Sequence, residues 1–259
     1  MKLVRLALLL ASIAAVAQSA DLEISRPVRS WEFLDAVGPK AGVFGAENGT
    51  LEAWAYPLKI FKDLHLRFVV GNRVIPAESI SRRLIAHAGS VTLLYSADEF
   101  SVAETIAVPI DEPGALIRLD VTAHDPIRID VAFTRDFQLM WPASIGSSYE
   151  DWSAENKAFL FGADGYPYAA VFGSPNAELV NREYASNYSV DNQTVFTLGT
   201  ASGTFERILA FAGSVKGRDD ALSVYRQLLS GSQKSFNETE SYYRDYLART
   251  VSVDLPDKH

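Results

Sequence analysis

The sequence predicts a mainly β fold in which two antiparallel sheets pack face to face and are followed by two helices. Short runs rich in Val, Ile, Leu, Phe and Thr recur over residues 51–212, and Pro, Gly, Asp or Asn separates them. Several runs alternate polar and apolar residues, as strands of antiparallel sheets with one solvated face do. After Gly213 the spacing of apolar residues becomes that of helices.

Residues 1–20 have the layout of a secretory signal peptide. Lys2 and Arg5 form a short positive region, an apolar stretch runs from Leu6 to Val16, and small residues end it at Ala17–Ala20. The apolar stretch is too short to span a bilayer, and a buried N-terminal helix would not explain the charged start. We expect the protein to be exported to the periplasm or the extracellular space, with no membrane attachment after cleavage.

Charge and composition exclude several function classes. The formal net charge of −8 falls by two, to about −10, when Lys2 and Arg5 leave with the signal. An acidic exported protein lacks the basic patch that binding to nucleic acid or anionic lipid requires. The chain has no Cys, and its four His lack metal-ligand spacing, so we predict no disulfide, metal or cofactor.

The first strands form the most informative part of the chain. Asn48-Gly49 lies between two strand-like runs and predicts a hairpin with a type I′ turn. The two faces of the outgoing strand would carry Leu51, Ala53 and Ala55 on one side and Glu52, Trp54 and Tyr56 on the other. Two aromatic rings and a carboxylate on one face could stack on a sugar ring and bond its hydroxyls. In the alternative, Trp54 and Tyr56 fill the core of the sandwich, with Glu52 at its margin.

The middle of the chain predicts further strands. They are Leu66–Val70, Val91–Ser96, Phe100–Val108, Ala115–Ala123, Ile127–Phe133, Ala158–Phe161, Tyr168–Phe172, Thr194–Leu198 and Phe205–Ala212. In Ala115–Ala123 the polar and apolar residues alternate clearly, and Leu116 alone breaks the pattern by standing among the polar positions. This number of half-solvated strands favours two packed antiparallel sheets over parallel βαβ units.

A second aromatic stretch runs from Arg135 to Trp152. It contains Asp136, Trp141 and Pro142, followed by Gly and Ser residues, and predicts a long loop that leaves the end of a strand. In one interpretation this loop joins Trp54 and Tyr56 in an aromatic wall along a sugar-binding cleft. In the other, Trp141 and Trp152 pack at the rim of the sandwich or against another domain.

Two helices should follow the β region. Apolar residues at helical spacing predict one helix over Arg218–Ser230 and a second over Ser235–Ala248. The stripe on the second helix consists of Phe236, Thr239, Tyr243 and Tyr246, with Tyr242 beside it. A further strand is predicted at Thr250–Pro256. We therefore divide the chain into a signal peptide (1–20), a β-domain (21–214) and a helical linker with a terminal strand (215–259).

Several motifs, in order along the chain, resemble one enzyme group. They are Trp31-Glu32-Phe33-Leu34, Gly42-Val43-Phe44-Gly45, Glu52–Lys59, Arg135–Pro142, the Gly146–Trp152 stretch and the Tyr242–Leu255 exit. Together they resemble the start of bacterial glycogen-debranching and glucoamylase-like glycoside hydrolases, from about Trp31 to Pro256. The resemblance implies an N-terminal β-supersandwich, similar to galactose mutarotases, and a helical linker. In such enzymes a catalytic (α/α)6 toroid follows, and nothing in this sequence resembles it.

The missing toroid determines the functional prediction. Glycoside hydrolysis needs two carboxyl groups, and in the resembling enzymes both come from the toroid, so no catalytic residue is carried over to this chain. The resemblance implies the non-catalytic part of an exported α-glucan hydrolase, partnered by a missing or separate (α/α)6 domain. The alternative is a free-standing carbohydrate-binding or scaffold protein. The predicted substrate-binding residues are Trp54, Tyr56, Asp136, Trp141 and Trp152.

Overall fold

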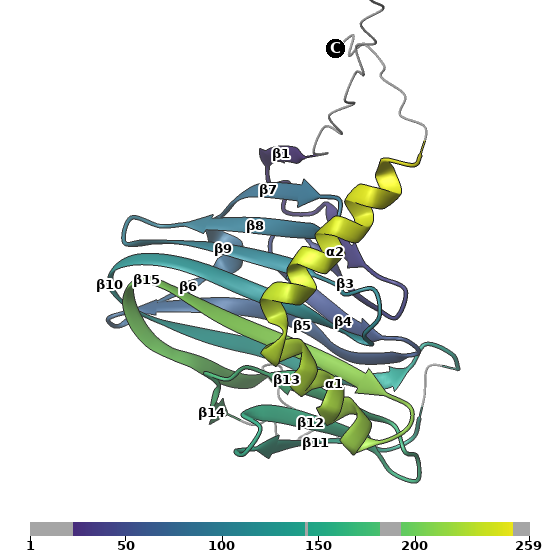
Figure 1. Cartoon of the computed structure of the whole chain (residues 1–259). Coiled ribbons are helices and arrows are strands. Elements are labelled where there is room, and N and C mark those ends of the chain that lie inside the picture. The colour runs from purple at the N-terminus through teal and green to yellow at the C-terminus, as the bar shows by residue number, and fades with distance from the viewer. Residues whose placement is uncertain (1–22, 143–144, 182–192, 251–259) are drawn as a thin grey trace, which may run out of the picture.

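The computed structural model describes residues 23–142, 145–181 and 193–250, and within them the predicted mainly β fold is confirmed (Figure 1). The predicted signal peptide and nearly all of the predicted terminal strand lie outside these ranges. The strands are β1 (Ile24–Pro27), β2 (Phe33–Val37), β3 (Ala41–Ala46), β4 (Leu51–Ala55), β5 (Leu58–Val70), β6 (Arg73–Pro76), β7 (Ser81–His87), β8 (Ser90–Ser96), β9 (Phe100–Ala107), β10 (Gly114–Leu139), β11 (Ser148–Ser153), β12 (Ala158–Ala163), β13 (Ala169–Gly173), β14 (Glu178–Asn181) and β15 (Thr194–Ser214). A short 3₁₀ helix covers Ala77–Ser79, and the chain continues into helices α1 (Arg218–Ser230) and α2 (Ser232–Leu247).

The two layers of the sandwich are joined by two long strands that belong to both. The first half of β10 pairs with β9 through Leu116–Ala123, and its second half pairs with β5 through Ile127–Leu139. Strand β15 pairs with β10 along both halves. One layer therefore runs β1-β7-β8-β9-β10-β15-β13-β12-β11, and the other runs β2-β3-β4-β5-β10-β15-β14. All pairings are antiparallel, and the fold is a curled supersandwich.

The core fills the space between the two layers. Phe68 on β5 lies 5.8 Å from Tyr95 on β8 and 5.0 Å from Phe100 on β9, measured between ring centroids. Farther along, the rings of Phe61 and Phe172 approach to 4.5 Å. Burial of these aromatic and aliphatic side chains is the main source of stability for a chain without disulfides.

Helix α1 covers the outer side of the first layer. It begins at Arg218 and ends at Ser230, as predicted, and it buries Ala221, Leu222, Tyr225 and Leu228. These residues form a second apolar cluster with Leu116 and with small residues of β12, β13 and β15. Leu116 therefore breaks the polar alternation of its strand because a helix covers that position.

Helix α2 is held to the sheet mainly by its first half. It begins at Ser232 rather than at the predicted Ser235, and it buries Phe236 and Thr239. Tyr242 and Tyr246 are about half exposed. In Figure 1, α2 continues from α1 and crosses in front of β9 and β8. Among the described residues, no helix combines the length and the apolar character that crossing a membrane would require.

The predicted β3–β4 hairpin is confirmed, but its predicted turn type is wrong. Gly49 has a φ of 92°, whereas Asn48 has no positive φ, and a type I′ turn needs both. Gly49 N donates to Ala46 O (2.9 Å) and Ala46 N donates to Thr50 O (3.0 Å), which defines a three-residue turn. Glu47 thus belongs to the turn instead of pairing across the ladder.

Glu47 uses this position to tie the hairpin to the N-terminal strand. Its carboxylate is fully buried, accepts two hydrogen bonds from the Arg26 guanidinium on β1, and accepts a third from Arg29 N at 2.7 Å. Burial raises the pKa of Glu47, but these hydrogen bonds outweigh burial and hold the pKa below its usual value. The carboxylate therefore stays ionised inside the protein.

The long loop predicted over Arg135–Trp152 is mostly wrong. Strand β10 continues to Leu139, and β11 already begins at Ser148. The side chain of Phe137 is buried in the core, whereas the flanking Asp136 and Gln138 are half-buried on the outer face. This is the alternation of a strand with one solvated face, so the segment pairs with β5 instead of leaving the sheet.

Candidate functional site

The outer face of the second layer carries most of the residues that the sequence singled out. On β4, Leu51, Ala53 and Ala55 are buried in the core, so the predicted alternation of faces is confirmed. Trp54 and Glu52 point to the opposite side and are half-buried. The alternative in which Trp54 fills the core does not hold.

Lys59 is the centre of a charged cluster on this face. Its ammonium lies 2.7 Å from Glu52 Oε2 and 3.0 Å from Asp136 Oδ2. Strand pairing creates this arrangement, because Lys59 on β5 stands opposite Trp54 on β4 and opposite Gln138 on β10. The cluster therefore joins residues from three neighbouring strands.

The cluster also fixes the orientation of the Trp54 indole. Trp54 Nε1 donates a 2.8 Å hydrogen bond to Glu52 Oε1, and the Lys59 ammonium lies 5.4 Å from the centre of the indole ring. Gln138 Nε2 donates to Asp136 Oδ1 at 3.0 Å, which fixes the second carboxylate. An aromatic ring and two oriented carboxylates are thus held in place on one face before any ligand binds.

The protonation state of Lys59 follows from its neighbours. Burial lowers the pKa of Lys59, but the hydrogen bonds and charges of Glu52 and Asp136 outweigh burial, and the pKa lies above its usual value. Lys59 therefore stays charged at neutral pH. Its ammonium pairs with both carboxylates and offsets one of their two negative charges, so the face carries an ion-pair cluster instead of a bare acidic cluster.

A strip of aromatic side chains continues from Trp54 across β3. Gly42 stands opposite Trp54, and a Cβ at Gly42 would lie 2.6 Å from the Tyr56 hydroxyl and 2.7 Å from the Phe44 ring. The absence of a side chain at Gly42 lets Tyr56 and Phe44 meet above it. Phe44 in turn stacks on Phe33 of β2, with ring centroids 6.3 Å apart and an interplanar angle of 29°.

We call this surface the polar–aromatic face. It consists of Phe44, Glu52, Trp54, Tyr56, Lys59 and Asp136. Beside it, a groove of about 390 Å³ lies between the β3–β4 hairpin and β5. Glu52 lines this groove and also belongs to the charged cluster, so the groove and the indole of Trp54 are neighbours.

The remaining predicted site residues lie at different distances from this face. Met140 N donates to Pro57 O at 2.8 Å, which places Trp141 beside the turn that follows Tyr56, and the Trp141 side chain is 86% exposed. Trp152, on β11, instead packs edge-on against the core residue Phe159 at 5.0 Å. The structure therefore brings Trp54, Tyr56 and Asp136 together and places Trp152 elsewhere.

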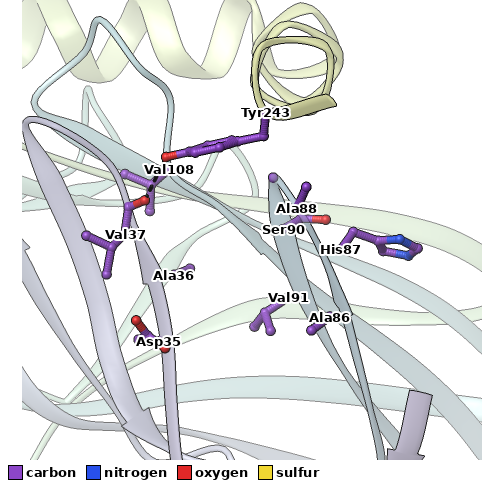
Figure 2. Close-up of a pocket in the computed structure, with 11 residues that line it drawn as sticks. Asp35, Ala36, Val37, Ala86, His87, Ala88, Ser90, Val91, Val108 and Tyr243 are labelled. Atoms are coloured by element: carbon purple, nitrogen blue, oxygen red, sulfur yellow. Dashed lines mark hydrogen bonds between the residues drawn. The ribbon is translucent and has the colours of Figure 1, made fainter. Parts of the chain in front are cut away.

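Two smaller hollows lie beneath α2. Figure 2 shows one of about 130 Å³, where Tyr243 reaches over β2 and donates a 3.0 Å hydrogen bond to Val37 O. Asp35 and His87 also line it. The second hollow, of about 310 Å³, lies where Arg118 packs on the Phe236 ring. Within residues 23–142, 145–181 and 193–250, no cluster of His, Cys, Asp or Glu could hold a metal ion.

Sequence reasoning missed Lys59 and Phe44 as members of the site. Lys59 ends the Glu52–Lys59 motif and Phe44 lies within Gly42–Gly45, but neither residue type by itself indicates a binding site. The signal that could have found Lys59 is its place opposite Trp54 in a two-strand hairpin, flanked by carboxylates on the same face. Asp136 comes from a strand more than seventy residues away, and only the pairing of β5 with β10 brings it close.

Comparisons with known proteins agree with the fold. No protein-family model matches this sequence, and no curated protein matches it significantly. Among solved structures, a bacterial glucoamylase in complex with acarbose aligns with 86% of this chain, at a TM-score of 0.57 and 11% identity. The chain spans 38% of that glucoamylase's length.

Two further structures align more loosely. A putative kojibiose phosphorylase from the human microbiome aligns with 85% of this chain and 31% of its own, at 8% identity and a TM-score of 0.45. A putative aldose 1-epimerase from Escherichia coli K12 aligns with 71% of this chain and 99% of its own, at 8% identity and a TM-score of 0.44. The fold of this chain is therefore the antiparallel β-supersandwich that also occurs, within a longer chain, in the bacterial glucoamylase.

Proposed function

We propose that this chain is the non-catalytic N-terminal part of an exported α-glucan-acting glycoside hydrolase. In this role it lines one side of the substrate cleft and packs against an (α/α)6 catalytic domain, in the same or a separate chain. The proposal is supported by the fold shared with a bacterial glucoamylase and by the sequence motifs that resemble such enzymes. The main structural observation in favour of this function is the polar–aromatic face.

The chemistry of this face suits a sugar. The apolar side of a pyranose ring stacks on an aromatic ring, and the hydroxyls at its rim donate hydrogen bonds to carboxylates. Trp54 offers the ring, and Glu52 and Asp136 offer carboxylate oxygens that Lys59 already holds in place. Because these groups are oriented beforehand, a bound sugar would lose little additional side-chain freedom.

The face is not suited to catalysis of hydrolysis. That reaction needs one carboxyl group that donates a proton and a second that acts as base or nucleophile. The two carboxylates nearest to Trp54 share the same ammonium group and serve as its counter-ions. We therefore assign binding and positioning to Glu52 and Asp136 and leave catalysis to the partner domain.

Exposed aromatic side chains elsewhere support a packing role. Trp141 follows β10 and is almost fully exposed, and Tyr242 and Tyr246 on α2 are about half exposed. Large exposed aromatic side chains occur where one protein surface meets another. The free-standing carbohydrate-binding protein remains the second candidate, because α1 already covers its apolar residues within this chain.

Titration of the purified chain with maltohexaose tests the binding role. We expect quenching or a shift of tryptophan fluorescence, and Trp54→Ala should weaken binding about two- to tenfold, since an aromatic stack contributes about 0.5–1.5 kcal/mol. Tyr166→Ala is the control, because Tyr166 is exposed but stacks only on Tyr168. Cellohexaose is the linkage control.

Three results would contradict the proposal. Absence of binding to any maltooligosaccharide would remove the role of the face. Equal binding of cellohexaose would remove the α-glucan assignment. Release of glucose from maltohexaose by the purified chain would contradict the assignment of catalysis to a partner domain.

A further inference from the structure

The groove beside the polar–aromatic face has features of a binding site that the sequence did not indicate. It is a shallow groove, open to solvent, with a volume of about 390 Å³, which is within the range of small-molecule sites. One side is formed by β2 and the β3–β4 hairpin, and the other by β5. Its lining residues include Phe33, Phe44, Glu52, Lys62 and Asp63.

Two stacked phenylalanines form the apolar side of the groove. Phe33 is 68% exposed and gains no core burial, yet its ring lies parallel enough to Phe44 to stack, at an interplanar angle of 29°. A largely solvated aromatic ring on a strand lowers solubility and adds little to the stability of the fold. Its position over Phe44 therefore suits a ligand that stacks on its free side.

Charged side chains form the other side. Lys62 and Asp63 are exposed on β5, and Asp63 has a φ of 52°, so the strand bulges at this point. Protein interfaces are depleted in charged residues at their centre, whereas a sugar needs hydrogen-bonding groups around a stacking ring. This combination favours a polyhydroxylated ligand over a protein partner.

The groove is continuous with the Trp54 position. Phe44 stands directly opposite Glu52 in the sheet, and Trp54 is two residues farther along the same side of β4. Glu52 uses Oε1 to bond Trp54 and also lines the groove. The Tyr56 hydroxyl, above Gly42, lies beside the Phe44 ring between the two positions.

We propose that the Phe33–Phe44 groove is a second sugar subsite, which holds further units of the same glucan chain whose other unit stacks on Trp54. This inference rests on the proposed function and deepens it. The ligand is a neutral, linear oligosaccharide that crosses β2, β3 and β4, with Glu52 bonding hydroxyls between the two subsites.

Calorimetric titration of the full chain with maltose, maltotriose and maltohexaose tests this arrangement. The wild-type affinity should rise about five- to tenfold from maltose to maltohexaose, because only the longer sugar reaches Phe33. Phe33→Ala should remove that gain and change maltose binding by less than about twofold. Phe33→Tyr keeps an aromatic ring at this position and should retain the gain. Trp54→Ala should weaken binding of all three sugars.

The controls separate the possible failures. Phe33 is exposed, so Phe33→Ala should keep the thermal unfolding temperature, and Tyr166→Ala should leave every affinity unchanged. Maltose binding without any gain from chain length would overturn the second subsite and leave the proposed function standing. No binding of any of these sugars would overturn both. A change in sedimentation coefficient in Phe33→Ala would identify the groove as a protein interface instead.

Discussion

At the scale of single residues, Glu104 is the most unusual group in the core. Its side chain on β9 is fully buried, and its Oε2 accepts a 2.5 Å hydrogen bond from the Tyr95 hydroxyl. Its second oxygen has no hydrogen-bond partner among the described residues. Burial raises the pKa of Glu104 to about 7, although the Tyr95 hydrogen bond acts in the opposite direction.

This carboxyl group should make stability depend on pH. The pKa rises on folding from 4.5 to about 7, so the folded state holds the proton more tightly than the unfolded state. Its contribution to stability is complete below pH 4.5 and is lost as the pH rises to 7. Across that window the loss amounts to about 3 kcal/mol.

Glu104→Gln should therefore change the shape of the pH profile. Gln can still accept the Tyr95 hydrogen bond but does not titrate, so relative to wild type the variant should gain about 3 kcal/mol between pH 4.5 and 7. Urea denaturation at several pH values measures the difference. Glu206→Gln, at an exposed position on β15, is the control. Parallel profiles for Glu104→Gln and wild type would rule out this role of Glu104.

Single residues also show how far the sequence could predict the site. The outward position of Trp54 followed from alternation along one strand, which is a local property. The ion pair between Lys59 and Asp136 depends on the pairing of β5 with β10, which sequence spacing does not encode. Leu116 departed from its strand's pattern for a similar reason, because the covering helix begins a hundred residues later.

At the scale of elements, the position of α2 on the sheet depends on one close contact with the β7–β8 turn. A Cβ at Gly89, in the β7–β8 turn, would lie 2.9 Å from Glu240 Cα and 3.0 Å from Thr239 O. Both are backbone atoms, so they can move only if the helix moves. Beyond this contact, the hydrogen bond from Tyr243 to Val37 O holds the second half of α2 to β2 (Figure 2).

Gly89→Ala should thus displace α2 without unfolding the sandwich. We expect amide hydrogen exchange in Ser232–Leu247 to accelerate about tenfold, while exchange in α1 stays unchanged, since α1 buries its own apolar stripe. Hydrogen exchange followed by mass spectrometry reports each helix separately. Ala88→Ser, in the same turn but exposed, is the matched control. Unchanged exchange in α2 would show that the β7–β8 turn does not fix the position of this helix.

Elements differed in how well the sequence predicted them. The range of α1 was predicted to the residue, because its apolar spacing and its acidic first turn are both local signals. Aromatic, Gly and Ser residues dominate the second part of the segment after Arg135, and this composition predicts a loop. Its first part still alternates, and the pairing with β5 extends the strand to Leu139.

At the scale of the whole molecule, the two layers should unfold together. Strands β10 and β15 contribute hydrogen bonds to both layers, and one continuous core lies between them. Loss of either layer would expose the apolar side of the other to water, which is unfavourable by about 25 cal/mol per Å². We therefore expect no stable intermediate with one layer formed.

Two tryptophans allow this to be measured. Trp54 lies on β4 in the second layer and Trp152 lies on β11 in the first, so variants that retain only one of the chain's four tryptophans, either Trp54 or Trp152, report each layer separately. Both should show the same urea midpoint, and this midpoint should agree with far-ultraviolet circular dichroism. Separate midpoints for the two reporters would show that the layers are independent units.

The shared strands also limit how this architecture can be altered over evolution or by engineering. A segment inserted within β10 would interrupt the pairing of both layers at the same time. Hairpin turns at the ends of the strands do not pair with both layers. In the β5–β6 turn, for example, a side chain at Gly71 would meet open space. Loop grafts, peptide tags and whole guest domains should therefore be accepted at such turns, while the paired length of β10 and β15 keeps its residue count.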